Sequence, residues 1–167
     1  MKEATTIEGG LLTITRFFDA PSEKIWRAWT EPEQVKKWWG PKDFTAPSIS
    51  IDLREGGKYL FCMRGKSSPE APVQDFWSTG TYKEVVPAKK LVMTDSFADE
   101  KGNVVSSTHY GMEGFPMELE FSVIFEDVEG GRTLMTLRHK GLPEGMMGDL
   151  TAQGWNQSFD KLSDSLR

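Results

Sequence analysis

The chain has 167 residues, and its 20 Lys and Arg residues against 25 Asp and Glu residues leave a formal net charge of −5 at pH 7. Its basic residues form no run longer than the pairs Lys36-Lys37 and Lys89-Lys90, so the basic patch of a nucleic-acid-binding protein is missing. This length is typical of one domain, and we predict a single domain over residues 1–167.

The sequence also limits targeting and covalent cross-links. Residues 1–10 contain no apolar run, and no stretch of about eighteen apolar residues occurs, so neither a leader peptide nor a membrane span is predicted. Cys62 is the only cysteine, which excludes an internal disulfide and the usual cysteine-based zinc spacings. We therefore expect a cytoplasmic protein.

The first elements are one strand and two short helices. Alternating apolar residues over 11–18 predict the first strand, preceded by a loosely ordered tail over residues 1–10. Pro21 and Ser22 then open a short helix, whose Trp26 and Trp29 we expect in the core between helix and sheet. Thr30 and Glu33 have the spacing of a capping box, which predicts a second short helix ending near Trp38.

The middle of the chain is rich in strands. The predicted strands after the two helices occupy residues 49–53, 59–63, 76–86, 91–97, 117–125 and 133–139. Glycine pairs at Gly56-Gly57 and Gly130-Gly131 join neighbouring strands as hairpin turns, so we assign them to turns rather than to a nucleotide site. Residues 98–115 interrupt this series of strands and show neither the alternation of a strand nor the spacing of a helix. A long segment of this kind predicts a lid or binding loop.

One long helix closes the chain, over 146–166. It carries an apolar stripe formed by Met147, Leu150, Trp155, Phe159, Leu162 and Leu166. A helix of this length is roughly 30 Å long and has to lie across the sheet. The order of elements therefore predicts an α+β fold in which an antiparallel sheet of six to seven strands packs against this helix.

Several motifs together resemble a known family. They are Phe17-Phe18-Asp19-Ala20-Pro21, Trp38-Trp39-Gly40-Pro41, Asp52-Leu53-Arg54 before Gly56-Gly57, Gly80 with Tyr82 and Val85-Val86-Pro87, and Gly154-Trp155-Asn156-Gln157-Ser158-Phe159-Asp160. As a set they resemble the family homologous to the C-terminal domain of the activator of the ninety-kilodalton heat-shock chaperone's ATPase (AHSA-type), part of the START-like or SRPBCC superfamily. The resemblance covers residues 11–166.

The resemblance implies a helix-grip fold, as in the birch-pollen allergen, with a curved sheet gripping the C-terminal helix and a cavity between them. Relatives in the superfamily bind lipids, hormones, polyketides or aromatic compounds, and some act as cyclases or hydroxylase partners. The resemblance does not assign a reaction, because fold alone does not determine function.

Candidate catalytic and metal-binding residues are few. His109 and His139 are the only histidines, and no further ligand pattern accompanies them, so we predict no metal site and no other cofactor. Cys62 lies within a predicted strand, where a small buried side chain is the ordinary interpretation. We assign no catalytic residue.

Large flexible and flat side chains are abundant, with 6 Trp, 10 Phe and 8 Met. They suit either an ordinary core or an adaptable apolar cavity. For a cavity, we predict a lining formed by Phe61, Met63, Trp77, His109, Tyr110, Met112, Met147, Leu150 and Trp155. His109 and Tyr110 would be its polar groups, since such sites are mostly apolar with a few placed polar atoms.

The function predicted from the sequence is binding of an apolar or aromatic small molecule between the sheet and the C-terminal helix. Two alternatives remain open. One is an interaction protein that regulates a chaperone, and the other is an enzyme that acts on an aromatic or polyketide substrate with His109 or Tyr110 as acid or base. No nucleic acid or membrane partner is expected, and the protein is expected to be a monomer or a homodimer.

Overall fold

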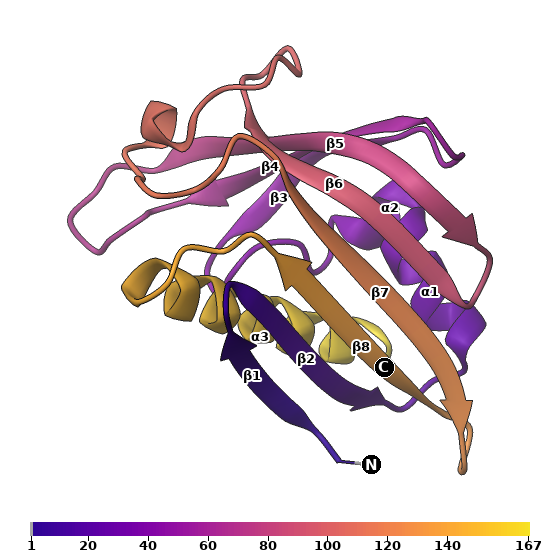
Figure 1. Cartoon of the computed structure of the whole chain (residues 1–167). Helices are drawn as coiled ribbons and strands as arrows, with labels where there is room; N and C mark the ends of the chain where they lie inside the picture. The colour runs from indigo at the N-terminus through magenta and orange to yellow at the C-terminus, as the bar shows by residue number, and fades with distance from the viewer. Residues whose placement is uncertain (1) are drawn as a thin grey trace.

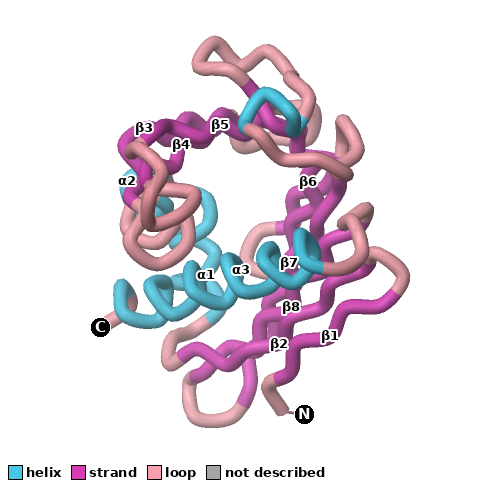
Figure 2. The backbone as a smooth tube through the Cα atoms, turned by 90° about the vertical axis from the view of Figure 1, so that its left-hand side faces the viewer, coloured by secondary structure: helices cyan, strands magenta, loops and turns pink. Residues whose placement is uncertain are grey.

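A long C-terminal helix, α3 (Met146–Ser165), lies along the concave side of a strongly curved antiparallel sheet (Figures 1 and 2). The structure is a computed structural model that describes residues 2–167. It confirms the predicted α+β architecture, with a sheet packed against one long helix. None of the described helices has the length and apolar character needed to cross a membrane.

The sheet has eight strands in the order β1-β2-β8-β7-β6-β5-β4-β3. Their bounds are β1 (Ala4–Glu8), β2 (Leu11–Phe18), β3 (Thr45–Ile51), β4 (Lys58–Gly65), β5 (Gln74–Val86), β6 (Lys90–Ala98), β7 (Leu119–Val128) and β8 (Arg132–Lys140). Every neighbouring pair is antiparallel, so sequential strands from β3 to β8 form a meander, and β2 joins it by pairing with β8.

The predicted count of six to seven strands was wrong, because β1 was taken for part of a loosely ordered tail. β1 pairs with β2 across a turn at Gly9 and Gly10, both of which have positive φ angles that glycine adopts without strain. Only Ile7 among the β1 side chains is even half-buried. An edge strand with so little apolar alternation leaves almost no hydrophobic signal in the sequence.

The two short helices are α1 (Ser22–Thr30) and α2 (Pro32–Val35). Trp26 and Trp29 are buried, as expected. The predicted capping box was wrong: Thr30 ends α1, and its hydroxyl donates to Trp26 O at 2.8 Å instead of capping α2. The start of α1 is held by β7, since Asp127 accepts hydrogen bonds from the backbone and side chain of Ser22.

Polar contacts anchor α3 on both sides. On one side, Arg16 of β2 donates to Asn156 O at 3.0 Å and forms an ion pair with Asp160. On the other, Lys161 donates to two carbonyl groups, Pro41 O and Phe44 O, in the loop after α2. These contacts fix the rotation of the helix and therefore the direction in which Trp155 points.

Candidate functional site

Strand register decides which side chains face α3. Phe61 of β4 is paired with Ser78 of β5, and its ring lies 4.7 Å from the ring of Trp39, which belongs to the loop after α2. Cys62, the next residue, is paired with Trp77. Because successive side chains of a strand point to opposite faces, Phe61 and Ser78 share the concave face, and Trp77 lies on the outer face.

Six side chains on the concave side contact one another in a continuous ring, which we call the interior cluster. Its members come from three strands, the helix α3 and the loop after α2, and they are Tyr59, Phe61, Asp95, His139, Trp155 and Trp39. One half of the cluster is polar and the other half is aromatic, and the two halves meet at Trp155.

A hydrogen bond in the polar half determines the protonation of His139. The indole Nε1 of Trp155 donates to His139 Nδ1 at 3.0 Å. An indole N–H cannot accept a hydrogen bond, so Nδ1 carries no proton and the ring is the neutral Nε2–H tautomer. His139 therefore has no free lone pair with which to act as a general base while this bond persists.

The other nitrogen of His139 points at a carboxylate. His139 Nε2 lies 3.2 Å from Asp95 Oδ2, but the contact is not aligned for a hydrogen bond, and within residues 2–167 Nε2 has no other partner. The His139 side chain is only 5% exposed and the Asp95 side chain 24% exposed. Buried polar atoms of native proteins are usually paired, so the unpartnered Nε2 marks this place as unusual.

Tyr59 completes the polar half next to Asp95. Its hydroxyl donates to Thr94 O at 2.7 Å across Gly80, where an added Cβ would come within 2.8 Å of the Tyr59 ring. Glycine at this position lets the phenol lie flat over β5. Burial raises the pKa of Tyr59 well above its ordinary value, and the negative charge of Asp95 adds to this shift, so the phenol is neutral.

The aromatic half consists of Trp39, Phe61 and Trp155. The ring of Trp39 lies 5.5 Å from that of Trp155 at 90°, and Phe61 lies 4.6 Å from Tyr59, which closes the interior cluster. Phe61 is 1% exposed, whereas Trp39 and Trp155 are only partly buried. Below them, Phe121 packs edge-on against Trp155 at 5.3 Å and belongs to the core.

Eight of the nine predicted lining residues divide into three groups, and the ninth, Tyr110, belongs to the loop before β7. Phe61 and Trp155 belong to the interior cluster, and Met63 lies on the concave face of β4 beside Gly40. Met112 and Met147 are half-buried. Three assignments need correction: Trp77 lies on the outer face, while His109 and Leu150 are exposed, Leu150 to 50%.

The expected lid contains a short 3-10 helix, η1 (Ser107–Tyr110), and packs against the sheet through Tyr110. The Tyr110 ring lies 5.3 Å from that of Phe76, its hydroxyl donates to Ala98 O, and it accepts a hydrogen bond from Trp77 N at 3.1 Å. Burial raises the pKa of Tyr110. These contacts occupy the phenol oxygen, so Tyr110 anchors the loop.

Sequence reasoning missed Asp95 and did not connect His139 with Trp155. A signal existed, because Asp95 interrupts the apolar series of Leu91 and Met93 at the spacing of two that marks one face of a strand. His139 follows Leu137 in the same way. A polar residue at an apolar position of a buried strand face is the pattern that would have indicated this site.

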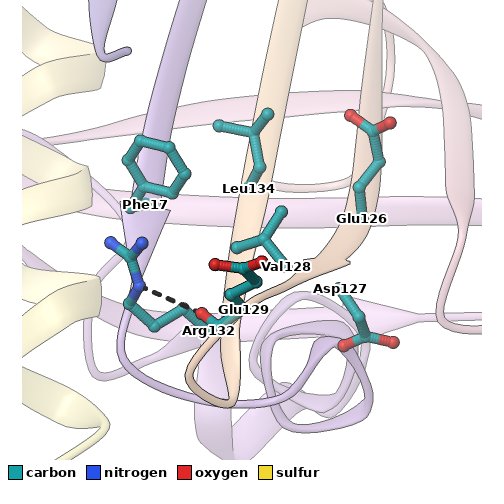
Figure 3. Close-up of a pocket in the computed structure, with 7 residues that line it drawn as sticks. All are labelled: Phe17, Glu126, Asp127, Val128, Glu129, Arg132 and Leu134. Atoms are coloured by element: carbon teal, nitrogen blue, oxygen red, sulfur yellow. Dashed lines mark hydrogen bonds between the residues drawn. The ribbon is translucent and has the colours of Figure 1, made fainter. Parts of the chain in front are cut away.

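Two hollows on the surface lie away from the interior cluster and include none of its residues. The first, of about 340 Å³, lies beside the β7–β8 hairpin on the outer face of the sheet (Figure 3). There the guanidinium of Arg132 stacks 4.6 Å from the Phe17 ring and donates to Glu129 O at 3.4 Å. The second, of about 510 Å³, lies near Lys89.

Comparisons with known proteins agree with this architecture. The protein NE0264 of Nitrosomonas europaea is 23% identical and superposes with a TM-score of 0.72, with 96% of each chain covered. A protein of Arthrobacter aurescens is 23% identical with a TM-score of 0.76, over 98% of this chain and 90% of the other. The AHSA1 protein of Silicibacter pomeroyi is 21% identical with a TM-score of 0.71, over 93% and 96%.

These likenesses show a shared helix-grip fold. A search of curated proteins found no match. The family model described as "Activator of Hsp90 ATPase homolog 1-like protein" matches residues 19–167. That range contains α1, α2, α3 and all six residues of the interior cluster. The resemblance read from the motifs is confirmed, and the chain belongs to this AHSA1 family.

Proposed function

We propose that this protein binds an apolar or aromatic small molecule between the sheet and α3, at the interior cluster. The observation that carries the proposal is the unpartnered Nε2 of His139 beside two tryptophans, Trp39 and Trp155, that the core does not fully bury. A ligand that covers the two partly exposed rings and pairs with the partly exposed Asp95 carboxylate beside Nε2 would stabilise this place.

The composition of the cluster supports the same class of ligand. Binding sites for small molecules are mostly apolar and aromatic, with a few polar groups that fix orientation. Here Trp39, Phe61 and Trp155 supply aromatic surface, and Asp95 and His139 supply the polar groups. Family membership is compatible with ligand binding in general but names no ligand.

The experiment is a titration with phenylbutanol, followed through the indole N–H signals of the protein by NMR. We expect the signals of Trp39 and Trp155 to shift in a saturable way and those of Trp77, on the outer face, to stay unchanged. Native mass spectrometry of the freshly purified protein would also detect a ligand retained from the host. Absence of any saturable shift would refute the proposal.

A pair of variants locates the binding. Ser78 lies on the concave face beside Phe61, whereas Thr81, three residues along the same strand, points to the outer face. Ser78→Phe should place a bulky ring beside Phe61 on the concave face and abolish the shifts, and Thr81→Phe should leave them intact. Equal effects of the two variants would place binding elsewhere.

A second candidate is regulation of a chaperone ATPase, favoured by the family description, which names an activator of the Hsp90 ATPase. The test is the ATPase rate of the host's Hsp90-type chaperone with and without this protein. Stimulation that survives Ser78→Phe would assign the effect to the surface of the protein. No stimulation at saturating protein would remove this candidate.

A further inference from the structure

The charge of Asp95 has no cationic partner within residues 2–167. Its nearest basic neighbour is His139, which is neutral because its Nδ1 accepts the indole proton of Trp155. Tyr59, the other polar neighbour, is a neutral phenol. On its strand, Asp95 is paired with the buried Leu119 of β7, which offers no charge.

The cations of the neighbouring elements have other partners. Lys83 and Lys140 both pair with Glu120, the residue after Leu119 on β7. Arg16 forms an ion pair with Asp160 at 2.9 Å. Lys161 donates to the backbone carbonyl groups of Pro41 and Phe44. None of them forms an ion pair with Asp95, so this carboxylate lies among aromatic side chains with three quarters of its side chain removed from water and no protein charge to balance it.

Aromatic faces next to an unbalanced carboxylate favour a cation. An ammonium group is attracted by the negative faces of tryptophan rings, and Trp39 and Trp155 both belong to the same cluster as Asp95. An ammonium also donates hydrogen bonds to a carboxylate with the added strength of charge. A hydroxyl group would lack the charge, and a ligand carboxylate would be repelled.

We propose that the ligand of the interior cluster is an amine with an apolar or aromatic body, whose ammonium group pairs with Asp95 while the body covers Trp39 and Trp155. This inference rests on the proposed function and specifies the chemical class of its ligand. The hydrogen bond from Trp155 keeps the His139 imidazole neutral, and the Asp95 carboxylate therefore stays available to the ammonium group of the ligand.

The test compares three probes that share one body: phenylbutylamine, phenylbutanol and phenylbutyrate. Each is titrated into the protein at neutral pH by calorimetry and by the indole N–H signals. Charge-assisted pairing predicts that the amine binds at least about tenfold more tightly than the alcohol. The carboxylate should bind most weakly, and the carboxyl carbon signal of Asp95 should shift with the amine.

Variants separate this inference from the proposed function. Asp95→Asn should remove the preference for the amine and keep the affinity for the alcohol, whereas Asp52→Asn, at an exposed carboxylate of the β3–β4 hairpin, should change neither. Equal binding of amine and alcohol to the unmodified protein would overturn the inference alone, whether or not Asp95→Asn folds. No binding of any probe would overturn the proposed function as well.

Discussion

Two pairs of tryptophans, Trp29 with Trp38 and Trp39 with Trp155, touch each other on the concave side. They differ in burial and in the partners of their indole N–H groups. Trp38 and Trp29 are 0% and 3% exposed, and their indoles donate to Ala28 O at 2.9 Å and to the Met135 sulfur at 3.3 Å. Trp155 is only partly buried, and its indole is bonded to an ionisable side chain, His139. The first pair is core, whereas the second holds a candidate site in place.

The largest expected effect is a loss of stability when a tryptophan of the buried pair, Trp29 and Trp38, is removed. Trp38→Ala should lower the free energy of unfolding by about 3–5 kcal/mol, because it removes a fully buried aromatic side chain. Trp39→Ala, at the neighbouring position, should cost less stability and instead weaken phenylbutanol binding. Urea unfolding and calorimetry measure the two quantities. A larger loss of stability in Trp39→Ala would contradict the distinction.

A second prediction removes the hydrogen bond between Trp155 and His139. Trp155→Phe keeps an aromatic ring but deletes the indole N–H, which leaves His139 Nδ1 without its donor. An unsatisfied buried acceptor costs about 1–3 kcal/mol of stability. In the unmodified protein, nitrogen NMR should show a protonated Nε2 and an unprotonated Nδ1. A proton on Nδ1 would contradict the hydrogen bond from Trp155, and protons on both nitrogens would contradict a neutral His139.

A third prediction concerns alkaline pH. The raised pKa of Tyr59 means that the folded state keeps its phenol proton at a pH where the unfolded chain loses it. The stabilising contribution is therefore complete below the ordinary value of 10.0 and is lost as pH rises above it. Tyr59→Phe should reduce this alkaline slope and lower stability at neutral pH by about 1 kcal/mol, through the lost bond to Thr94 O.

The control for that prediction is Tyr110→Phe. Burial also raises the pKa of Tyr110, but its phenol is less deeply buried than that of Tyr59, so this variant should change the alkaline slope less. Unfolding by urea at several pH values between neutral and strongly alkaline provides the slopes. An unchanged alkaline slope in Tyr59→Phe would show that this phenol does not titrate differently in the folded and unfolded states.

The smallest expected effect is at Leu150, which the helical stripe wrongly assigned to the interior. Because its side chain is 50% exposed, Leu150→Gln should change stability by no more than about 0.5 kcal/mol and should not affect probe binding. Phe159→Ala, on the buried face of the same helix, is the matched comparison and should cost about 3–5 kcal/mol. Thermal unfolding separates the two.

Errors in the sequence prediction have distinct physical causes. Trp77 was placed in the lining because alternation shows that a strand has two faces but not which face is concave. Strand β1 was missed because its side chains are mostly exposed. The capping box failed because the Thr30 hydroxyl bonds back within α1. In each case a contact from another part of the fold, or its absence, decided the outcome.

The sequence by itself determined the strand-rich meander from β3 to β8, the two short helices, the long α3 and membership of the family, because these depend on local periodicity, turn residues and motifs. Only the tertiary structure brought Asp95, His139 and Trp155 together, since they come from β6, β8 and α3. Which side chains meet across a curved sheet depends on register, curvature and the rotation of the helix, and these arise from packing between segments distant in the sequence.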